Sequence, residues 1–189
     1  MADDQRLYPQ RKSPRLRDYD YSQEGAYFVT VCAQGRVHLF GVVAEGEMRL
    51  NPAGVMVAQW WEKLPGKFPD IELDQYIVMP NHFHSIVVIN RFGLAPRTDA
   101  RALRTDAPAG ASLRTSLFAV MDWFKTMTTN AYIHGVKKRH WQPFPGKLWQ
   151  RSYHDHIIRH EVDLNRLREY TIYNAAHWDK DIFYCDQSA

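Results

Sequence analysis

The segment "IELDQYIVMPNHFHSIVVI" (residues 71–89) constrains the fold more than any other part of the chain. It holds two runs of strand length, residues 71–79 and 82–89, joined tightly at Pro80 and Asn81. Successive side chains of a strand point to opposite faces, so His82 and His84 project together. The segment predicts two neighbouring strands, with a pair of histidines at the start of the second.

Two further strands and a hairpin are predicted elsewhere. Residues 26–32 alternate bulky and small side chains, and residues 152–159 contain a last short strand. A hairpin is predicted from residues 38–43 and 47–51, with Gly46 in its turn.

Three segments have helical patterns. The first begins with Asn51 as N-cap and Pro52 in the first turn, and the sequence "PGKFP" ends it. The second covers residues 116–135 and is expected to end at Gly135, and the third covers residues 161–178. The apolar positions expected to pack are Val57, Trp60, Trp61 and Leu64 in the first helix, Leu117, Val120, Met121, Phe124 and Met127 in the second, and Val162, Leu164, Leu167 and Ile172 in the third.

The order of these elements is strand, hairpin, helix, strand, strand, helix, strand, helix. Without the hairpin it reads βαββαβ followed by an extra helix, which is typical of a split βαβ sheet. We therefore predict an α+β fold, a ferredoxin-like or RRM-like antiparallel sheet with helices on one face and an additional C-terminal helix. The length of 189 residues suits one domain with a sizeable core.

Residues 91–114 interrupt this pattern. The sequence "RTDA" occurs at 97 and again at 104, and Phe92 is the only aromatic residue. Such a segment cannot bury enough apolar surface to order itself, so we expect a flexible insertion. Contact of its arginines with nucleic acid is the less favoured interpretation.

Composition limits the class of protein only weakly. The chain has 24 Lys and Arg against 21 Asp and Glu, and a net charge of +3 is a mild indication of an anionic partner. Cys32 and Cys185 lack metal-type spacing and are expected to be reduced thiols. We find no apolar run of membrane-spanning length and no signal-peptide core, so we expect a soluble, cytoplasmic protein.

The histidine pair has two interpretations. Two imidazoles at this spacing can reach one metal ion, but a site needs a third ligand from elsewhere in the fold. The alternative is a pair of strand histidines that only pack, one buried and one at the rim. The motif alone slightly favours packing.

The last helix changes this balance. Tyr170 and Asn174 are four residues apart and share a helix face. If that face covers the histidines, Asn174 can supply a carbonyl oxygen to the metal while Tyr170 holds its phenol beside the ion. A metal would polarise a phosphodiester, and the phenolate would attack it to form a phosphotyrosine. Imidazole and amide-oxygen ligands together suit Mn²⁺ or Mg²⁺.

Three stretches resemble a known family in the expected order. "VMPNHFHSIVVI" is similar to the HUH motif (His, a bulky hydrophobic, His) of single-tyrosine transposases. "LWQRSYHDHIIRHEVDLNRLREYTIYNAAHW" resembles the C-terminal signature of one branch, the REP-associated tyrosine transposases, and "RDYDYSQEGAYFVTVCAQGRVHLFG" resembles that branch's N-terminal segment. The resemblance covers roughly residues 11–178, with the interruption at 91–114.

The resemblance implies a function and site residues. His82 and His84 match the paired metal ligands, Tyr170 the nucleophile and Asn174 the polar ligand. The family cleaves and rejoins single-stranded DNA through a 5′-phosphotyrosine, and this branch acts on palindromic repeats that fold as hairpins in bacterial genomes. On this basis we expect a basic arm over residues 1–25, a catalytic domain over 26–178, a tail over 179–189, and a monomer or homodimer associated with the nucleoid.

Two features compete with this assignment. Tyr173 lies only about 60° around the helix from Tyr170, so helical phase does not exclude it as the nucleophile. A second H-x-H sequence, "HDH", places His154 and His156 two apart, and His154 stands where the family more usually has an aromatic residue. We favour packing or DNA contact for this second pair over a second metal site.

Contacts with DNA are predicted only as a set. Each basic residue taken alone is more often solvated surface than a binding site. The candidate phosphate contacts are Arg11, Lys12, Arg15, Arg17, Lys125, Lys137, Lys138, Arg139 and Arg151.

The sequence therefore predicts a metal-dependent endonuclease and strand transferase for single-stranded DNA hairpins. One rival is a non-catalytic hairpin-binding module on the same fold. A second rival is a metal-dependent hydrolase that forms no covalent intermediate.

Overall fold

The computed structural model describes residue 16, residues 19–90 and residues 114–185. Most of the predicted N-terminal arm, including Arg11, Lys12, Arg15 and Arg17, lies outside these residues. The predicted insertion lies outside them too, except for Arg114.

Within the described residues the strands form a four-stranded sheet and a separate hairpin. The sheet has the order β4-β5-β1-β6, and every neighbouring pair is antiparallel. The strands are β1 (Gly25–Cys32), β2 (Gly41–Ala44), β3 (Glu47–Leu50), β4 (Ile71–Val78), β5 (His82–Ile89) and β6 (His154–Ile158). β2 and β3 form the predicted hairpin, and Gly46 turns it with a φ of 77°.

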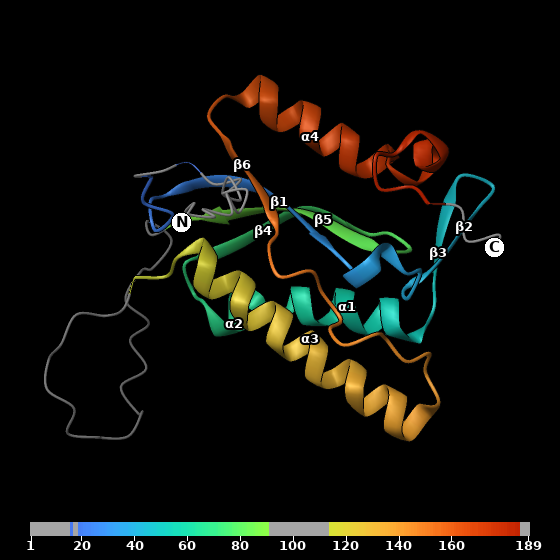
Figure 1. Cartoon of the computed structure of the whole chain (residues 1–189). Helices are drawn as coiled ribbons and strands as arrows, with labels where there is room; N and C mark the ends of the chain where they lie inside the picture. Colours follow the sequence, from blue (N-terminus) through green and yellow to red (C-terminus); the bar gives the residue numbers. More distant parts are fainter. Residues whose placement is uncertain (1–15, 17–18, 91–113, 186–189) are drawn as a thin grey trace, which may run out of the picture.

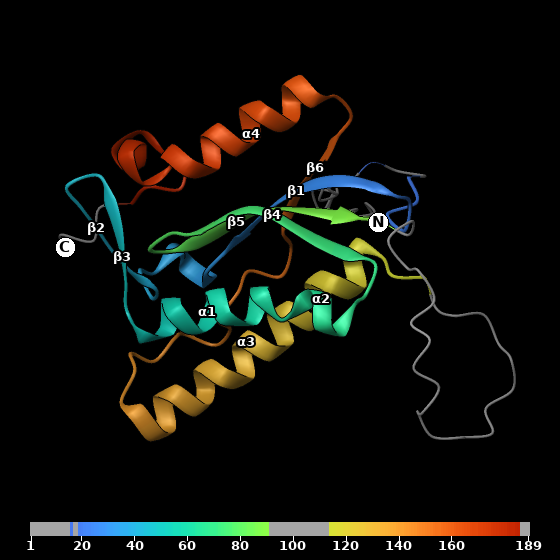
Figure 2. The same ribbon diagram turned by 180° about the vertical axis from the view of Figure 1, so that it is seen from behind.

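Helices lie on both sides of this sheet. They are α1 (Pro52–Glu62), α2 (Leu64–Lys67), α3 (Leu117–Arg139) and α4 (Glu161–Tyr173), with 3-10 helices η1 (Gln34–Arg36) and η2 (Ala175–Lys180). Figure 1 shows α1 and α3 against one face of the sheet and α4 over the other, and Figure 2 shows the same layers from behind. The predicted α+β architecture with an antiparallel sheet is confirmed. None of the described helices is long and apolar enough to span a membrane.

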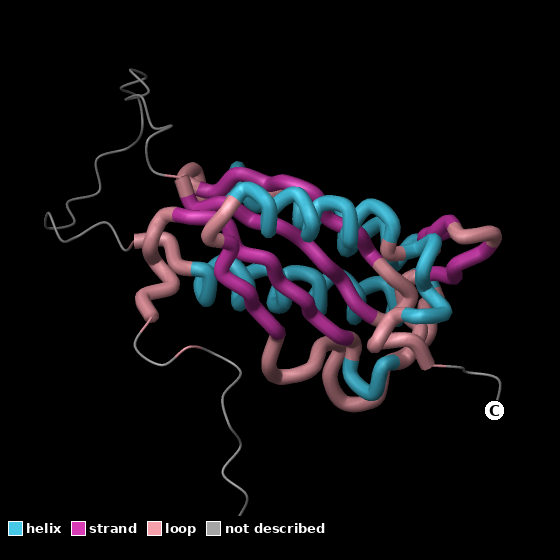
Figure 3. Tube along the Cα trace, turned by 90° about the horizontal axis from the view of Figure 1, so that it is seen from above, coloured by secondary structure: helices cyan, strands magenta, loops and turns pink. Residues whose placement is uncertain are grey.

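The main core lies between the sheet and the α1–α3 layer. The Trp61 ring of α1 packs 4.9 Å from Phe83 of β5 and 5.0 Å from Phe124 of α3. β5 is buried along nearly its whole length because helices cover both of its faces. Figure 3 looks down on the outer layer, with α4 lying over the strands. His82, the first residue of β5, is therefore buried away from solvent.

The first helix begins as the sequence predicts. The Asn51 side-chain oxygen accepts hydrogen bonds from the N–H groups of Ala53 and Gly54, each at 2.9 Å, and Pro52 occupies the first turn.

The prediction that the second helix ends at Gly135 is wrong. α3 continues to Arg139, and His140 takes the left-handed conformation (φ 56°, ψ 35°) that ends it. Gly135 serves packing instead, because a Cβ there would overlap the ring of Trp141.

The packing positions predicted for the last helix are partly wrong. Val162 is 82% exposed and Ile172 is 53% exposed, whereas Thr171 and Asn174 are buried. α4 also ends at Tyr173, and the chain continues as η2. Leu164 and Leu167 are half-buried and share the inner face with Thr171, so hydrophobic periodicity identifies only part of that face, which also carries polar residues opposite the histidines of the sheet.

Candidate metal and nucleophile site

The two histidines of β5 lie side by side beneath α4. His82 is fully buried and His84 is 1% exposed, and their ring centroids are 4.4 Å apart. In the register of the sheet, His82 is opposite Cys32 and His84 is opposite Thr30 of β1. The two-residue period of the strand thus brings both imidazoles to one face, as the sequence predicts.

Neighbouring polar groups orient both rings. His82 Nδ1–H donates to Asn81 Oδ1 at 2.8 Å, since an amide oxygen can only accept. His84 Nδ1 shares a 2.8 Å hydrogen bond with Thr30 Oγ1. Donation from Nδ1 leaves the Nε2 of His82 with a lone pair, the arrangement in which an imidazole binds a metal, and the Thr30 hydroxyl can accept from His84 in the same way.

Both imidazoles are held in the neutral form that binds metals. Burial, with smaller contributions from Arg36 and His38, lowers the pKa of His82 to about 3. Burial and the neighbouring His82 hold the pKa of His84 well below its usual value.

α4 carries Tyr170 and Asn174 to the same place. The Tyr170 hydroxyl lies 3.3 Å from His84 Nε2, and the two rings are 5.2 Å apart. Asn174 is 3% exposed at the end of the helix. Asn174 Oδ1 and His82 Nε2 are both buried and have no hydrogen-bond partner among the described residues. Two such acceptors in one site would be unfavourable unless a cation or a donor joined them.

Asp181 completes the cluster, and the sequence prediction did not include it. Its Oδ2 accepts hydrogen bonds from the Tyr170 hydroxyl at 3.2 Å and from Asn174 Nδ2 at 2.8 Å. Its Oδ1 accepts the backbone N–H of Phe183 at 2.6 Å. In the sequence, the only indication of this ligand is an acidic residue seven positions after Asn174. The segment around it has no hydrophobic periodicity that would place it near the histidines.

One group of three potential metal ligands occurs in the described part of the chain. It consists of His82, His84 and Asp181, each of which offers a ligand atom within 4.8 Å of the others. The side-chain amide of Asn174 joins this group through its hydrogen bond to Asp181, so two neutral imidazoles, one carboxylate and one amide lie together. This donor set fits a divalent cation.

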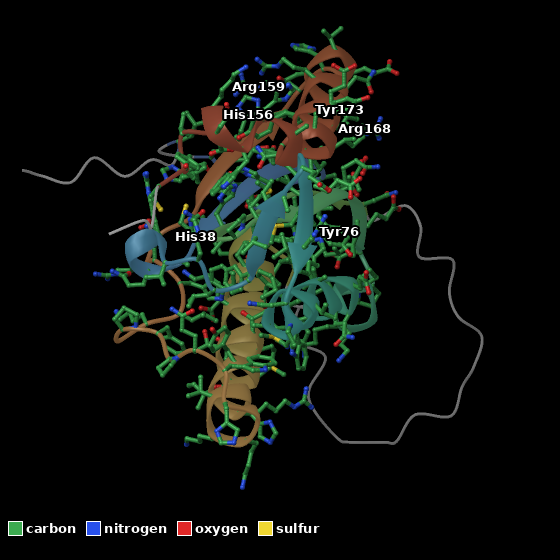
Figure 4. The ribbon with its side chains drawn as sticks, turned by 90° about the vertical axis from the view of Figure 1, so that its right-hand side faces the viewer. His38, Tyr76, His156, Arg159, Arg168 and Tyr173 are labelled. Carbon is green, nitrogen blue, oxygen red and sulfur yellow. The ribbon has the colours of Figure 1, made fainter. Side chains whose placement is uncertain are left out.

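The protein keeps the Tyr170 phenol protonated. Burial, followed by the charge and hydrogen bond of Asp181, raises the pKa of Tyr170 to about 12. The competing Tyr173 lies on the more exposed side of α4, where it is 57% exposed and labelled in Figure 4.

An ion pair fixes α4 on the sheet. Arg168 donates from Nε to both Asp74 oxygens at 3.0 and 3.1 Å, and from Nη2 to Oδ2 at 2.5 Å. Asp74 lies where the pairing of β4 with β5 shifts register. The pair joins the helix that carries Tyr170 to the edge of the sheet.

The second H-x-H pair lies on β6 and is not part of the metal-ligand group. His156 Nε2 forms a 2.6 Å hydrogen bond with Asp163 of α4, and both His154 and His156 are exposed. Figure 4 shows His156 on the side of α4 away from Arg168.

The described basic candidates are not brought together at the site. The Lys125 ammonium donates to the backbone oxygens of Gln150 and Arg151. Lys137, Lys138 and Arg139 are exposed in the last turn of α3, on the face of the sheet opposite α4.

This chain is similar in structure to a transposase and similar in sequence to a bacterial protein. No family model matches the chain. Its structure is similar to that of a REP-associated tyrosine transposase bound to a REP hairpin, with a TM-score of 0.51 and 18% identity over 85% of this chain and 71% of the other. The fold is therefore of a transposase kind.

A relative in sequence is an uncharacterized protein of Haemophilus influenzae. It is 33% identical over 184 residues, which cover 93% of this chain and 94% of the relative. The chain belongs to the same family as that protein.

Proposed function

We propose that this protein is a metal-dependent endonuclease and strand transferase for single-stranded DNA, of the single-tyrosine, REP-associated kind. One observation carries the proposal: the Tyr170 hydroxyl lies 3.3 Å from His84 Nε2 and 3.2 Å from Asp181, at the edge of a group that can hold a metal. A tyrosine fixed beside metal ligands is an arrangement suited to nucleophilic attack on a phosphodiester. The strand order β4-β5-β1-β6 also supports the finer, ferredoxin-like assignment of the sheet.

Four side chains would hold the cation, and the donors support Mg²⁺ or Mn²⁺. They are His82 and His84 through Nε2, Asn174 through Oδ1 and Asp181 through its carboxylate. A bound cation would polarise the scissile phosphate and offset the negative charge that develops on it.

The reaction exchanges one phosphodiester for another. The Tyr170 oxygen attacks the phosphorus, the bond from phosphorus to the 3′ oxygen breaks, and the 5′ phosphate stays on the tyrosine. The phenolic proton passes along its hydrogen bond to Asp181 Oδ2 and on to solvent, and the departing 3′ oxygen takes up a proton from solvent. A free 3′-OH can then attack the phosphotyrosine and reverse these steps, which joins strands without a further energy source.

The substrate we propose is a hairpin formed by a palindromic repeat, together with adjacent single-stranded DNA. The structural neighbour is described as bound to a REP hairpin, and the shared fold supports a similar ligand here. Arg151 and the Lys137–Arg139 cluster, together with the basic residues near the N-terminus, are proposed to contact phosphates. Their removal should make binding less dependent on salt concentration.

The proposed catalytic domain extends beyond residue 178. Asp181 belongs to the cluster and Phe183 is buried against His82, with ring centroids 4.8 Å apart. Tyr170 and the proposed metal ligands can meet within a single chain, so we propose that the monomer is the active unit.

The experiment is a denaturing gel of labelled hairpins, taken from palindromes near the protein's own gene, after incubation with the protein. Wild type, Tyr170→Phe and Tyr173→Phe are compared with Mn²⁺ and with chelator. We expect a covalent adduct with wild type and Tyr173→Phe, only when metal is present. Bound hairpins with neither adduct nor cut strand would favour the binding module, and cut strands without any adduct would favour the hydrolase.

A further inference from the structure

A pocket of about 490 Å³ opens directly beside Tyr170 and His84. It lies between β1, β6, α4 and the segment that follows η2. The mechanism proposed above uses only the edge of this pocket, where the hydroxyl of Tyr170 meets the metal-ligand group.

The register of the sheet sets the floor of the pocket. Thr30 of β1 is opposite His84 of β5 on one side and His154 of β6 on the other. Their side chains therefore form a row across three strands on the face covered by α4. Since neighbouring strands are about 4.8 Å apart, His154 lies about 10 Å across the sheet from His84. The second H-x-H sequence thus faces the same side as the metal-ligand histidines.

The walls of the pocket are largely apolar and aromatic. The Phe28 ring lies 5.3 Å from His84, nearly parallel to it, and 6.0 Å from Tyr170. The Phe183 ring also lines the pocket, and its centroid lies 6.4 Å from that of the His154 ring.

The rim carries a cation. The Arg36 guanidinium lies 5.4 Å from the centroid of the Phe183 ring and donates to the carbonyl of Ile182 at 3.2 Å. The pocket therefore has a positive charge next to its aromatic wall.

The two histidines of β6 differ in their partners. His156 is paired with Asp163 of α4, as described above. His154 is exposed and has the Phe183 ring beside it, so it can meet an incoming ligand.

We propose that this pocket binds the base of a nucleotide that flanks the scissile phosphate, with His154 as the contacting residue at its floor. The inference rests on the proposed function, since it places that base within the same strand that Tyr170 attacks. A flat aromatic ring between apolar walls, with a cation near the phosphate, is the usual way proteins hold an unpaired base. The volume falls in the range of small-ligand sites, about 300–1,000 Å³.

The test combines abasic DNA with protein variants. Single abasic positions are placed in turn on each side of the cleavage site of the labelled hairpin. For each, the DNA concentration that gives half the maximal rate of adduct formation is measured for wild type, His154→Ala and His154→Phe. His134→Ala is the control, because His134 is an exposed histidine of α3 on the opposite face of the sheet.

We expect one flanking position at which loss of the base raises that concentration about tenfold, which is the usual effect of losing one stacked base. His154→Ala should have a similar effect on intact DNA and little further effect on DNA abasic at that position. His154→Phe, which keeps a flat ring, should retain most of the affinity, and His134→Ala should behave as wild type.

The possible results separate the pocket from the proposed chemistry. Two results would overturn the pocket but leave the proposed function. In the first, adducts form and every abasic position changes the half-maximal DNA concentration equally. In the second, the effects of His154→Ala and of the abasic site on that concentration are additive. If no adduct forms with any hairpin, the proposed function fails, and binding is compared instead by fluorescence anisotropy, with single abasic positions placed in turn along the single strand beside the hairpin. Non-additive binding would then still support the base pocket, and additive binding would overturn it.

Discussion

Replacing Arg168 by alanine should loosen the helix that carries Tyr170. Arg168 makes three hydrogen bonds to Asp74, whose side chain is 16% exposed, while its own is 39% exposed. Solvent screening reduces the value of such a half-exposed pair. We therefore expect Asp74→Ala and Arg168→Ala each to lower the free energy of unfolding by about 1–2 kcal/mol, with a coupling energy of about 1 kcal/mol.

The assay is urea unfolding of wild type, both single variants and the double variant near neutral pH. Arg166→Ala is the matched control, because Arg166 sits one half-turn away on α4 and its side chain is 72% exposed in its ion pair with Asp163. It should leave the unfolding midpoint unchanged. If α4 needs this anchor to place Tyr170, Arg168→Ala should also slow adduct formation by about tenfold or more, since small displacements of a reacting group have large effects.

The pH dependence of the coupling provides a second check. The hydrogen bonds from Arg168 hold the pKa of Asp74 below its ordinary value. The stabilisation is therefore fully present above the carboxyl's ordinary pKa of about 3.9 and is lost as the pH falls through the lowered value. A coupling energy within about 0.3 kcal/mol of zero near neutral pH, or an equal loss with Arg166→Ala, would refute the anchor.

Three further predictions concern the metal, the pH profile and the packing of α3. Asp181→Asn should weaken Mn²⁺ binding, measured by calorimetry, by about 10–100-fold, whereas loss of the exposed neighbouring carboxylate in Asp179→Asn should not. The rate of adduct formation should rise with pH from ~6 to ~9, because the pKa of Tyr170 is about 12 and the phenolate fraction grows with pH; a flat profile would exclude attack limited by the phenolate. Gly135→Ala should lower the free energy of unfolding by about 1–3 kcal/mol in urea titrations, because its Cβ would overlap a packed ring, while Gly66→Ala has open space and should not.

The elements that position the site could be predicted because each has a local signal. The two-residue period of β5 is sufficient to put His82 and His84 on one face. The four-residue spacing of Tyr170 and Asn174 is sufficient to put them on one side of a helix. The start of α1 has a local signal in Asn51 and Pro52, and the structure confirms that start.

Other features depend on contacts between distant segments. Asp181 reaches the site only because the chain turns back after α4 through η2, and no periodicity indicates that turn. Val162 and Ile172 have the side chains of packing residues, yet they are exposed because the inner face of α4 has to meet polar groups. Gly135 resembles a helix end in sequence, but its role is set by Trp141, which follows the end of α3.

The most direct test of the account is to locate the covalent bond. Wild-type protein is reacted with a hairpin in Mn²⁺, the DNA is trimmed with nuclease, and the protein is digested with trypsin. Cleavage after Arg168 and Lys180 gives one peptide that contains both Tyr170 and Tyr173. Tandem mass spectrometry should place the nucleotide mass on Tyr170, whose hydroxyl lies beside His84 and Asp181. A nucleotide on Tyr173, or cleaved DNA without any modified peptide, would contradict the account.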